Sequence, residues 1–417
     1  MSEARGRRLL FVAPQPFAAG ELLHGLHVAD EATRGGHRVT FVAPAAVGPL
    51  LDGVTFESWL WDAPMAGLLD GVRTAVQAER FDAIVWVDLA QLLQLLQSGR
   101  DTHAQHALAE SFGVPMVALD LWSLDRSAGL VPGRLLPVPF AAPGAPGAYD
   151  ALPVAARLTP AERDQVRRQM GLGPAERMVL LASSPFQHAA FWSAAGAAPG
   201  GASPLPLATD PGDAVRSTEH VPDLLGRYLA RLGPAVTVVH VGPAPYPELA
   251  RHLGPRYRFG ARMPRPVFLR LLGAADLLLS LNITASTVAS AVALEVPVLL
   301  VTSAYGGPAA KVLGRLPGMP TPELREWIER AAPLHPFRLW PLGSPFARSL
   351  FRDNPYNTAY DNVELLHGDE VAETCRRLLW DAPAAEALRA RQRAYCEQVR
   401  ALPSALTVLD RLLDGHG

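Results

Sequence analysis

Residues 271–298 read LLGAADLLLSLNITASTVASAVALEVPV, and this stretch decides the fold class. Residues 277–279 are a short apolar run, residues 282–287 are rich in hydroxyl groups, and residues 288–294 are small and mostly apolar. This order predicts a buried strand, a polar loop and a helix, followed by a second apolar strand at 296–301. A strand, a helix and another strand in succession are typical of a parallel sheet with crossover helices.

The same stretch carries no charged residue over the 18 positions from Leu277 to Leu294. A membrane-spanning helix needs roughly 20 apolar residues, so a membrane segment has to be considered. The hydroxyl-rich loop divides the stretch into a strand and a helix. We therefore expect a buried unit of a globular domain and no membrane partner.

The alternation of strands and helical segments continues on both sides of this stretch. In the C-terminal half we expect further strands at 178–182, 235–241 and 257–259, and helices near 222–232 and 265–273. In the N-terminal half we expect strands at 9–12, 37–42, 54–59, 83–87 and 115–119, and helices at 20–34, 64–79 and 103–112. The pattern predicts an α/β fold with two tandem, doubly wound parallel-sheet domains of Rossmann-like type.

The boundary between these domains is predicted from composition. Residues 127–153 are rich in Pro, Gly and Ala, which suits an extended connector. Thr159-Pro160-Ala161-Glu162 then has the residues of a capped helix start. We therefore expect domains at 1–153 and 154–368, with charged C-terminal helices at 369–417 that pack back toward the first domain.

Composition and charge narrow the classes of protein. The chain has 417 residues, 49% of them apolar, and a net charge of −2, which fits two globular domains and disfavours a nucleic-acid partner. Its two cysteines, Cys375 and Cys396, form no disulfide framework, and the charged N-terminus lacks the pattern of a secretory signal. We expect a cytoplasmic protein that acts on a small molecule, and its oligomeric state stays open.

Three stretches carry a resemblance to a known superfamily. They are Leu10-Phe-Val-Ala-Pro with the later Arg34-Gly-Gly-His37-Arg-Val, the segment LTPAERDQVRRQMGLGPAERMVLLASS at 158–184, and Gly260-Ala-Arg-Met-Pro with residues 271–298. Together they resemble glycosyltransferases of the two-Rossmann-domain architecture known as GT-B, over most of the chain. The resemblance implies two domains that face each other across a cleft, the first on the acceptor side and the second binding a nucleotide sugar.

The resemblance also implies a reaction. We expect a glycosyltransferase-like enzyme that moves a sugar from a nucleotide-diphosphate sugar to a small-molecule or peptide acceptor, in natural-product biosynthesis. The nucleotide sugar is a co-substrate, and we expect no further cofactor and no metal. Two alternatives remain open: a nucleotide-sugar epimerase or hydrolase of the same fold, and a non-catalytic GT-B-like binding or scaffold protein.

The donor site is expected along the second domain's strand ends. Hydroxyl side chains and amides at a helix N-terminus can meet a diphosphate, which favours Asn282, Thr284, Ser286 and Thr287 as ligands. The chain has Asn282-Ile283-Thr284 where the superfamily shows His-Gly-Gly, and Glu295 where it shows Gly. The alternative is that these hydroxyls only cap a buried helix.

Other donor-site residues follow from the resemblance alone. It implies that Ser183 and Ser184 approach the phosphates and that Arg262 and Met263 hold the base. It places Asn357 in the loop that binds the donor sugar, with Tyr305-Gly306-Gly307 as a competing loop.

The catalytic residues are expected on the first domain. Transfer with inversion needs a base beside the acceptor, and the superfamily orients it with an acid that matches Asp88. The position of the base corresponds to Glu21, and His24 is the alternative one helical turn later. His24 and His27 can instead be half-buried residues of an amphipathic helix. Pairing them, or His103 with His106, as metal ligands has little support, because no carboxylate or cysteine lies at ligand spacing.

Overall fold

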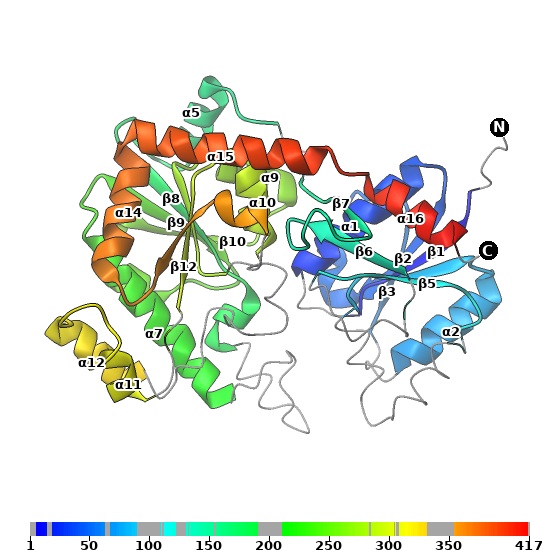
Figure 1. Cartoon of the computed structure of the whole chain (residues 1–417), viewed down its shortest axis with the longest axis horizontal. Helices are drawn as coiled ribbons and strands as arrows, with labels where there is room; N and C mark the ends of the chain where they lie inside the picture. The colour runs from blue at the N-terminus through cyan, green and yellow to red at the C-terminus, as the bar shows by residue number, and fades with distance from the viewer. Residues whose placement is uncertain are drawn as a thin grey trace. The chain divides into compact units, whose positions relative to one another are not determined.

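The computed structural model describes two compact units (Figure 1). The described residues are 6–14, 19–62, 67–89, 110, 112–121, 131, 133–153, 156–190, 211–282, 285–303, 305, 308–331 and 354–415. The first unit takes in Met1–Leu152, Pro345–Pro355 and Glu397–Gly417, and the second Pro153–Ser344 and Tyr356–Cys396. Each unit is built around its own parallel sheet.

The strands of the first unit are β1 (Arg8–Val12), β2 (Arg38–Pro44), β3 (Glu57–Trp61), β4 (Ala83–Trp86), β5 (Met116–Leu119), β6 (Gly133–Val138) and β7 (Ala148–Asp150). Within the described residues they form a parallel seven-stranded sheet in the order β3-β2-β1-β4-β5-β6-β7. The strand order reverses beside β1, so the edge beyond β1 and β4 is the place where ligands bind in such sheets.

Helices cover this sheet. They are α1 (Ala19–Arg34), α2 (Leu68–Glu79) and α16 (Ala405–Asp414), with a 3₁₀ turn at Ala45–Leu50. Alternate strand residues point to opposite faces, and one set packs with α2 through Leu10, Val12, Ile84, Trp86, Leu68, Val72 and Val76. Leu9 and Phe11, which point the other way, are also fully buried. Burial of both faces explains why these strands are continuous apolar runs rather than alternating ones.

The predicted extended connector at 127–153 is wrong, because residues within it form β6 and β7. The two strands pair with each other and β6 pairs with β5, which extends the sheet. Pro137 lies inside β6, and Pro and Gly flank both strands, so composition indicated a linker where the chain adds edge strands. α16 packs on β6 and β7 and on α1, which places the C-terminal helix in this unit.

The second unit has the strands β8 (Arg177–Ala182), β9 (Val236–Gly242), β10 (Tyr257–Ala261), β11 (Leu277–Ser280), β12 (Val298–Thr302) and β13 (Asp361–Glu364). Its described strands are all parallel, in the order β10-β9-β8-β11-β12-β13. The order reverses between β8 and β11. The two doubly wound parallel sheets predicted from the sequence are thereby confirmed.

The helices of this unit are α5 (Pro160–Gln169), α7 (Pro211–Ala230), α8 (Pro247–Leu253), α9 (Arg265–Ala274), α10 (Ser286–Ala293), α11 (Ala309–Leu313), α12 (Pro322–Ala331), α14 (Gly368–Trp380) and α15 (Ala382–Arg400), with 3₁₀ turns at Pro185–Gln187, Gly254–Arg256 and Pro355–Thr358. α7 begins at Pro211, eleven residues before the predicted helix at 222. The predicted helix at 103–112 lies almost wholly outside the described residues. None of the described helices is long and apolar enough to cross a membrane.

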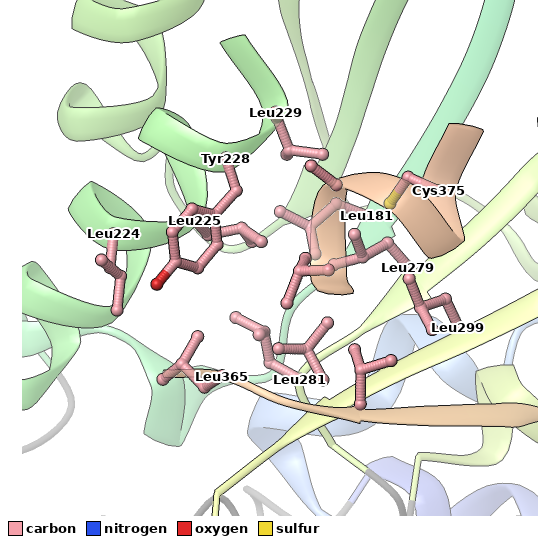
Figure 2. Packing of buried hydrophobic residues seen from close by; sticks show 14 of the residues in the cluster. Leu181, Leu224, Leu225, Tyr228, Leu229, Leu279, Leu281, Leu299, Leu365 and Cys375 are labelled. Carbon is pink, nitrogen blue, oxygen red and sulfur yellow. The ribbon is translucent and has the colours of Figure 1, made fainter. Parts of the chain in front are cut away.

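Figure 2 shows the core on one face of the second sheet. Leu225, Tyr228 and Leu229 of α7 pack toward the strand residues Leu181 and Leu279, and α14 adds the buried Cys375, again within one cluster. The opposite face is covered by α9 and α10, and α10 contacts both β11 and β12. This two-sided packing fixes where β8 and β11 end.

α5 begins as its sequence predicts. The Thr159 amide donates to Glu162 Oε2 at 2.8 Å, and Thr159 Oγ1 accepts from the Glu162 amide at 3.3 Å, which completes a capping box. Asp276, just before β11, accepts from Arg163 of α5 at 2.7 Å and from the Met178 amide of β8 at 2.7 Å. These bonds tie the helix to the amino ends of the central strands.

Candidate functional site

Two loops leave the carboxyl edge of the second sheet side by side. Leu279 of β11 pairs with Leu181 of β8, so the strands are in register up to their ends. Ser183 follows β8 and Asn282 follows β11, at the point where the strand order reverses. Ligands of open parallel sheets bind at this point, so the structure brings the two predicted donor loops to one edge.

The N-terminus of α10 lacks a side-chain cap. Its N-cap residue is Ala285, which has no polar side-chain atom, and Ser286 and Thr287 occupy the first two helical positions. Both side chains are half-buried, and among the described residues their hydroxyls have no hydrogen-bond partner. First-turn amides and hydroxyls without internal partners can hold an anion, aided by the helix dipole.

The start of this loop is fixed locally. Ser280 Oγ donates to the carbonyl of Asn282 at 3.0 Å and accepts from the Asn282 amide at 3.1 Å. The Asn282 carbonyl also accepts from the Ala285 amide at 3.2 Å, which turns the chain into α10. Asn282 is buried. Thr284, the remaining predicted residue of this loop, lies outside the described residues.

The loop after β8 contains a cluster that the sequence did not reveal. Ser183 Oγ lies 2.8 Å from His188 Nε2 and 2.7 Å from His240 Nε2, so two imidazoles share one hydroxyl. The turn at Pro185–Gln187 brings His188 back to Ser183, and Gln187 Oε1 accepts from the Ser184 amide at 2.8 Å. Ser184 therefore shapes the turn, whereas the Ser183 side chain bonds to both imidazoles.

Two tyrosines complete this cluster. The ring of Tyr246 is parallel to those of His188 and His240, with centroids 4.6 Å away from each. Tyr257 Oη lies 2.7 Å from His240 Nδ1 and accepts from the Tyr246 amide at 2.8 Å. We call Ser183, His188, His240, Tyr246 and Tyr257 the hydroxyl–imidazole cluster.

Both imidazoles of the cluster are neutral near pH 7. Burial, with a smaller effect of the Arg262 charge, lowers the pKa of His188 to about 4. Burial, with a smaller effect of His188, lowers the pKa of His240 to about 3. Arg262 forms no ion pair with a carboxylate of the described residues, so within this part of the chain the guanidinium near His188 keeps its positive charge uncompensated. A neutral hydroxyl and imidazole pair beside that charge suits an anionic ligand.

The end of β9 must be glycine for the cluster to form. A Cβ atom on Gly242 would lie 2.1 Å from Ser183 Oγ and 2.9 Å from His240 Nε2. Neither atom can retreat without breaking the hydrogen bond between them. Gly242 thus provides the space in which the hydroxyl meets the imidazole.

The remaining predicted donor residues, Met263 and Asn357, lie in two different parts of the second unit. Met263 follows β10 with Arg262, and its Cε would lie 3.5 Å from a Cβ built on Gly260. Asn357 lies in the 3₁₀ turn at Pro355–Thr358, where its Oδ1 accepts from the Tyr360 hydroxyl. That bond fixes the Asn357 side chain, and the structure shows no contact between it and the cluster.

The predicted catalytic residues lie at the carboxyl edge of the first sheet. Asp88 follows β4 and is 3% exposed. A Cβ on Gly25 would lie 2.6 Å from Val87 Cγ1, so α1 packs tightly on the residue before Asp88. Adjacent to this contact, His24 is buried and packs edge-to-face on Phe140, with ring centroids 5.3 Å apart.

Glu21 lies one turn before His24 and is only half-buried by surface area. Burial of its carboxyl group nevertheless raises its pKa. A carboxylate with a raised pKa is a stronger base than an ordinary one. His27, on the same helix, lies 3.5 Å from Glu31, which suits a structural role.

Sequence reasoning missed His188, His240, Tyr246 and Tyr257. One signal was available, because His240 stands alone as a titratable residue in the buried strand VTVVHVG, two positions before a glycine. It also missed Asp120, which ends β5 fully buried and pairs with Arg134 at 3.2 Å. Among the described residues no group of three or more His, Cys, Asp or Glu could hold a metal ion. His103 and His106 lie outside them.

Solved glycosyltransferase structures resemble the chain over nearly its whole length. The spinosyn forosaminyltransferase SpnP matches with a TM-score of 0.54 and 14% identity, over 98% of each chain. HepE from Anabaena, solved with UDP and glucose, matches with a TM-score of 0.54 and 16% identity, over 98% of this chain and 99% of HepE. SnogD from Streptomyces nogalater gives 0.52 and 14%, with the same coverage. These similarities confirm the predicted GT-B fold.

Sequence comparisons place the chain in a family. No curated protein matches it. The sequence model of the family of unknown function DUF6365 matches residues 126–417, which takes in β6, β7 and the whole second unit. Because that match covers more than half of the chain, this protein belongs to the DUF6365 family and has the fold of the GT-B glycosyltransferases.

Proposed function

We propose that this chain is a glycosyltransferase-like enzyme that takes a sugar from a nucleotide-diphosphate sugar and transfers it to a small-molecule or peptide acceptor. The observation that carries the proposal is the uncapped N-terminus of α10 beside Ser183. Two first-turn hydroxyls, the amides beneath them and the Ser183 hydroxyl all lie at the switch point of the second sheet. These groups suit a diphosphate.

Neighbouring structures support the donor class. HepE was solved with UDP-glucose, and VinC with dTDP. Both share the fold of this chain at low identity. We propose that Ser183, Asn282, Thr284, Ser286 and Thr287 meet the diphosphate, that Arg262 and Met263 lie by the base, and that Asn357 serves the donor sugar. No metal is needed in this scheme, since amides, hydroxyls and the Arg262 charge offset the diphosphate charge.

We further propose that the acceptor binds to the first unit and that Glu21 is its base. Glu21 is more exposed than His24, and its raised pKa suits proton abstraction from an acceptor hydroxyl. His24 is held against Phe140, and Asp88 lies buried at the end of β4. A role in natural-product biosynthesis is part of the proposal, since the spinosyn forosaminyltransferase SpnP and the calicheamicin glycosyltransferase CalG4, which share the fold, are named for natural products.

Calorimetric titration tests the donor assignment. Purified protein is titrated with UDP, dTDP, ADP, GDP, UDP-glucose and dTDP-glucose, and at least one of them should bind. Absence of binding to all six would refute the assignment. If a bound nucleotide sugar is consumed in the absence of any acceptor, the protein is the epimerase or hydrolase. If it binds but is not consumed, either alone or with any acceptor of a broad panel, a binding protein is favoured.

A further inference from the structure

The hydroxyl–imidazole cluster has a hydrogen-bond direction that is fixed at one end by the backbone. The Tyr246 amide can only donate, and its nitrogen lies 2.8 Å from Tyr257 Oη. Tyr257 accepts that bond, and the arrangement that then gives each group of the cluster one partner has Tyr257 direct its own hydrogen to His240 Nδ1, 2.7 Å away. A neutral imidazole carries one hydrogen, so His240 carries it on Nε2.

The same direction continues to His188. His240 Nε2 donates to Ser183 Oγ across 2.7 Å. Ser183 has one hydroxyl hydrogen and directs it to His188 Nε2, 2.8 Å away. His188 then carries its hydrogen on Nδ1. In the unliganded protein the hydroxyl hydrogen of Ser183 is therefore already in use.

An anion at Ser183 changes this arrangement. A phosphate oxygen offers only lone pairs, so Ser183 can bind it only by turning its hydrogen away from His188. Lone pairs of Ser183 Oγ and His188 Nε2 would then face each other. A proton taken up on His188 Nε2 restores the bond, with His188 as donor, and leaves Ser183 with two bonds accepted and one donated.

We propose that binding of the donor's diphosphate at Ser183 is coupled to the uptake of one proton from solvent by His188. The inference rests on the proposed function and adds to it a group that offsets the charge of the leaving diphosphate. His240 cannot take the proton on Nδ1 without losing its bond from Tyr257. His188 acts through Ser183 and is a positioning residue, whereas Ser183 touches the ligand.

The surroundings of His188 suit this switch in charge. Its ring stacks on Tyr246 with 2° between the planes, and an aromatic face stabilises an imidazolium. The charged and titratable groups that act on the cluster are Arg262 on His188, His188 on His240, Glu248 on the two tyrosines, and Tyr257 on Tyr246. A bound diphosphate would offset the Arg262 charge that, with burial, holds His188 neutral.

Nuclear magnetic resonance of ¹⁵N-labelled histidines tests the hydrogen-bond direction without ligand. At neutral pH we expect the hydrogen of His240 on Nε2 and that of His188 on Nδ1. The variants His188→Gln and His240→Gln assign the signals. The opposite tautomer at either residue, or a His188 that is charged without ligand, would overturn the proposal.

Calorimetry measures the proton directly. UDP-glucose is titrated near pH 5.5 in two buffers that differ in ionisation enthalpy, since its diphosphate diester has no proton to gain or lose in this range. We expect the wild type to take up between about 0.2 and 0.9 of a proton for each UDP-glucose, because a nearby opposite charge raises a pKa by about 1 to 3 units. Between about pH 5 and 7 the affinity should fall as the pH rises, by up to about tenfold for each pH unit.

His188→Gln is the decisive variant. Its side-chain amide can donate to Ser183 without taking up a proton, so UDP-glucose should still bind and the uptake should vanish. His252→Gln, which changes a half-buried histidine of α8 bound to Asp223, should keep the wild-type uptake. Binding without uptake in the wild type, or equal uptake in His188→Gln, would overturn this inference alone. Failure of inorganic pyrophosphate and of all six nucleotides tested above to bind would overturn the proposed function and the inference together.

Discussion

Glu295 has a left-handed backbone, with φ of 55°, and its carboxylate accepts from Arg393 Nη1 at 2.8 Å. The residue follows α10, where a helix commonly ends in this conformation and usually with glycine. Arg157 forms a second ion pair with the same carboxylate. The buried Glu295 side chain thus holds two arginines at the position where the superfamily pattern shows Gly, and the backbone keeps the glycine conformation.

This relationship predicts an order of stabilities at position 295. Glu295→Ala keeps the strained backbone and loses both ion pairs, whereas Glu295→Gly loses the ion pairs but relieves the strain. We expect the glycine variant to be more stable than the alanine variant by about 1 kcal/mol. Urea unfolding of both variants measures the difference. An alanine variant as stable as the glycine variant would show that the left-handed conformation costs nothing here.

Thr287→Ala tests the phosphate role of the α10 N-terminus. The Thr287 hydroxyl makes no hydrogen bond with any residue that the structure describes, so its loss should change the free energy of unfolding by less than about 0.5 kcal/mol. A lost hydrogen bond to a charged ligand costs about 1.5 to 3 kcal/mol, which predicts roughly a 10- to 100-fold weaker binding of the nucleotide sugar. Thr74→Ala, on the exposed face of α2, is the matched control and should leave binding unchanged. Unchanged affinity in Thr287→Ala would remove this residue from the donor site.

The neutral histidines predict an acid-sensitive fold. The folded pKa of His188 is about 4 and that of His240 about 3, both below the ordinary 6.5, so unfolding binds protons as the pH falls. The two neutral histidines make their full contribution to the free energy of unfolding above about pH 6.5. That contribution is lost as the pH falls from 6.5 toward their folded pKa values. It should amount to a few kcal/mol.

The slope of stability against pH measures that contribution. Urea unfolding is followed from pH 7 to pH 4 in the wild type and in His240→Gln. The variant should lose less stability over this interval, whatever its stability at pH 7. Parallel curves would mean that His240 is not neutral in the folded protein.

Glu21→Gln tests the proposed base. We expect the rate of transfer to fall by about 10² to 10⁴, with nucleotide-sugar binding retained. Because burial raises the Glu21 pKa, wild-type activity should fall toward acid pH at a higher pH than for an ordinary glutamate. Asp30→Asn, which changes an exposed acid on the same helix, is the control. If Glu21→Gln keeps full activity, the base is a different residue.

The fold could be predicted because buried parallel strands are recognisable from composition. Residues 277–279 and 178–182 are apolar throughout since both faces of the sheet are covered, and polar residues follow each run. β6 and β7 were not predicted because Pro137 and the surrounding glycines indicate a linker. Only the pairing of β6 with β5 shows that this segment belongs to the sheet. Local pattern cannot show such a pairing.

For the candidate site, too, local sequence suggested some residues and could not suggest others. Thr287 could be named as a candidate because it lies at a predicted helix start, and Ser183 because the resemblance places it by the phosphates; both roles stay predictions. His188 and His240 were missed because their roles depend on contacts between distant residues. Ser183 and His240 are 57 residues apart in sequence, and only the sheet register brings them within 2.7 Å.

Because position 242 must be glycine, the hydroxyl–imidazole cluster can be recognised in a sequence by two short motifs. No side chain at position 242 fits between the Ser183 hydroxyl and the His240 imidazole. A homologue that keeps this arrangement must therefore have the motif Ser-x₄-His after one strand and the motif His-x-Gly at the end of the next. A relative with alanine at the glycine must have abandoned the shared hydroxyl. These two motifs can therefore divide the family into members that we expect to take up a proton when they bind their ligand and members that we do not.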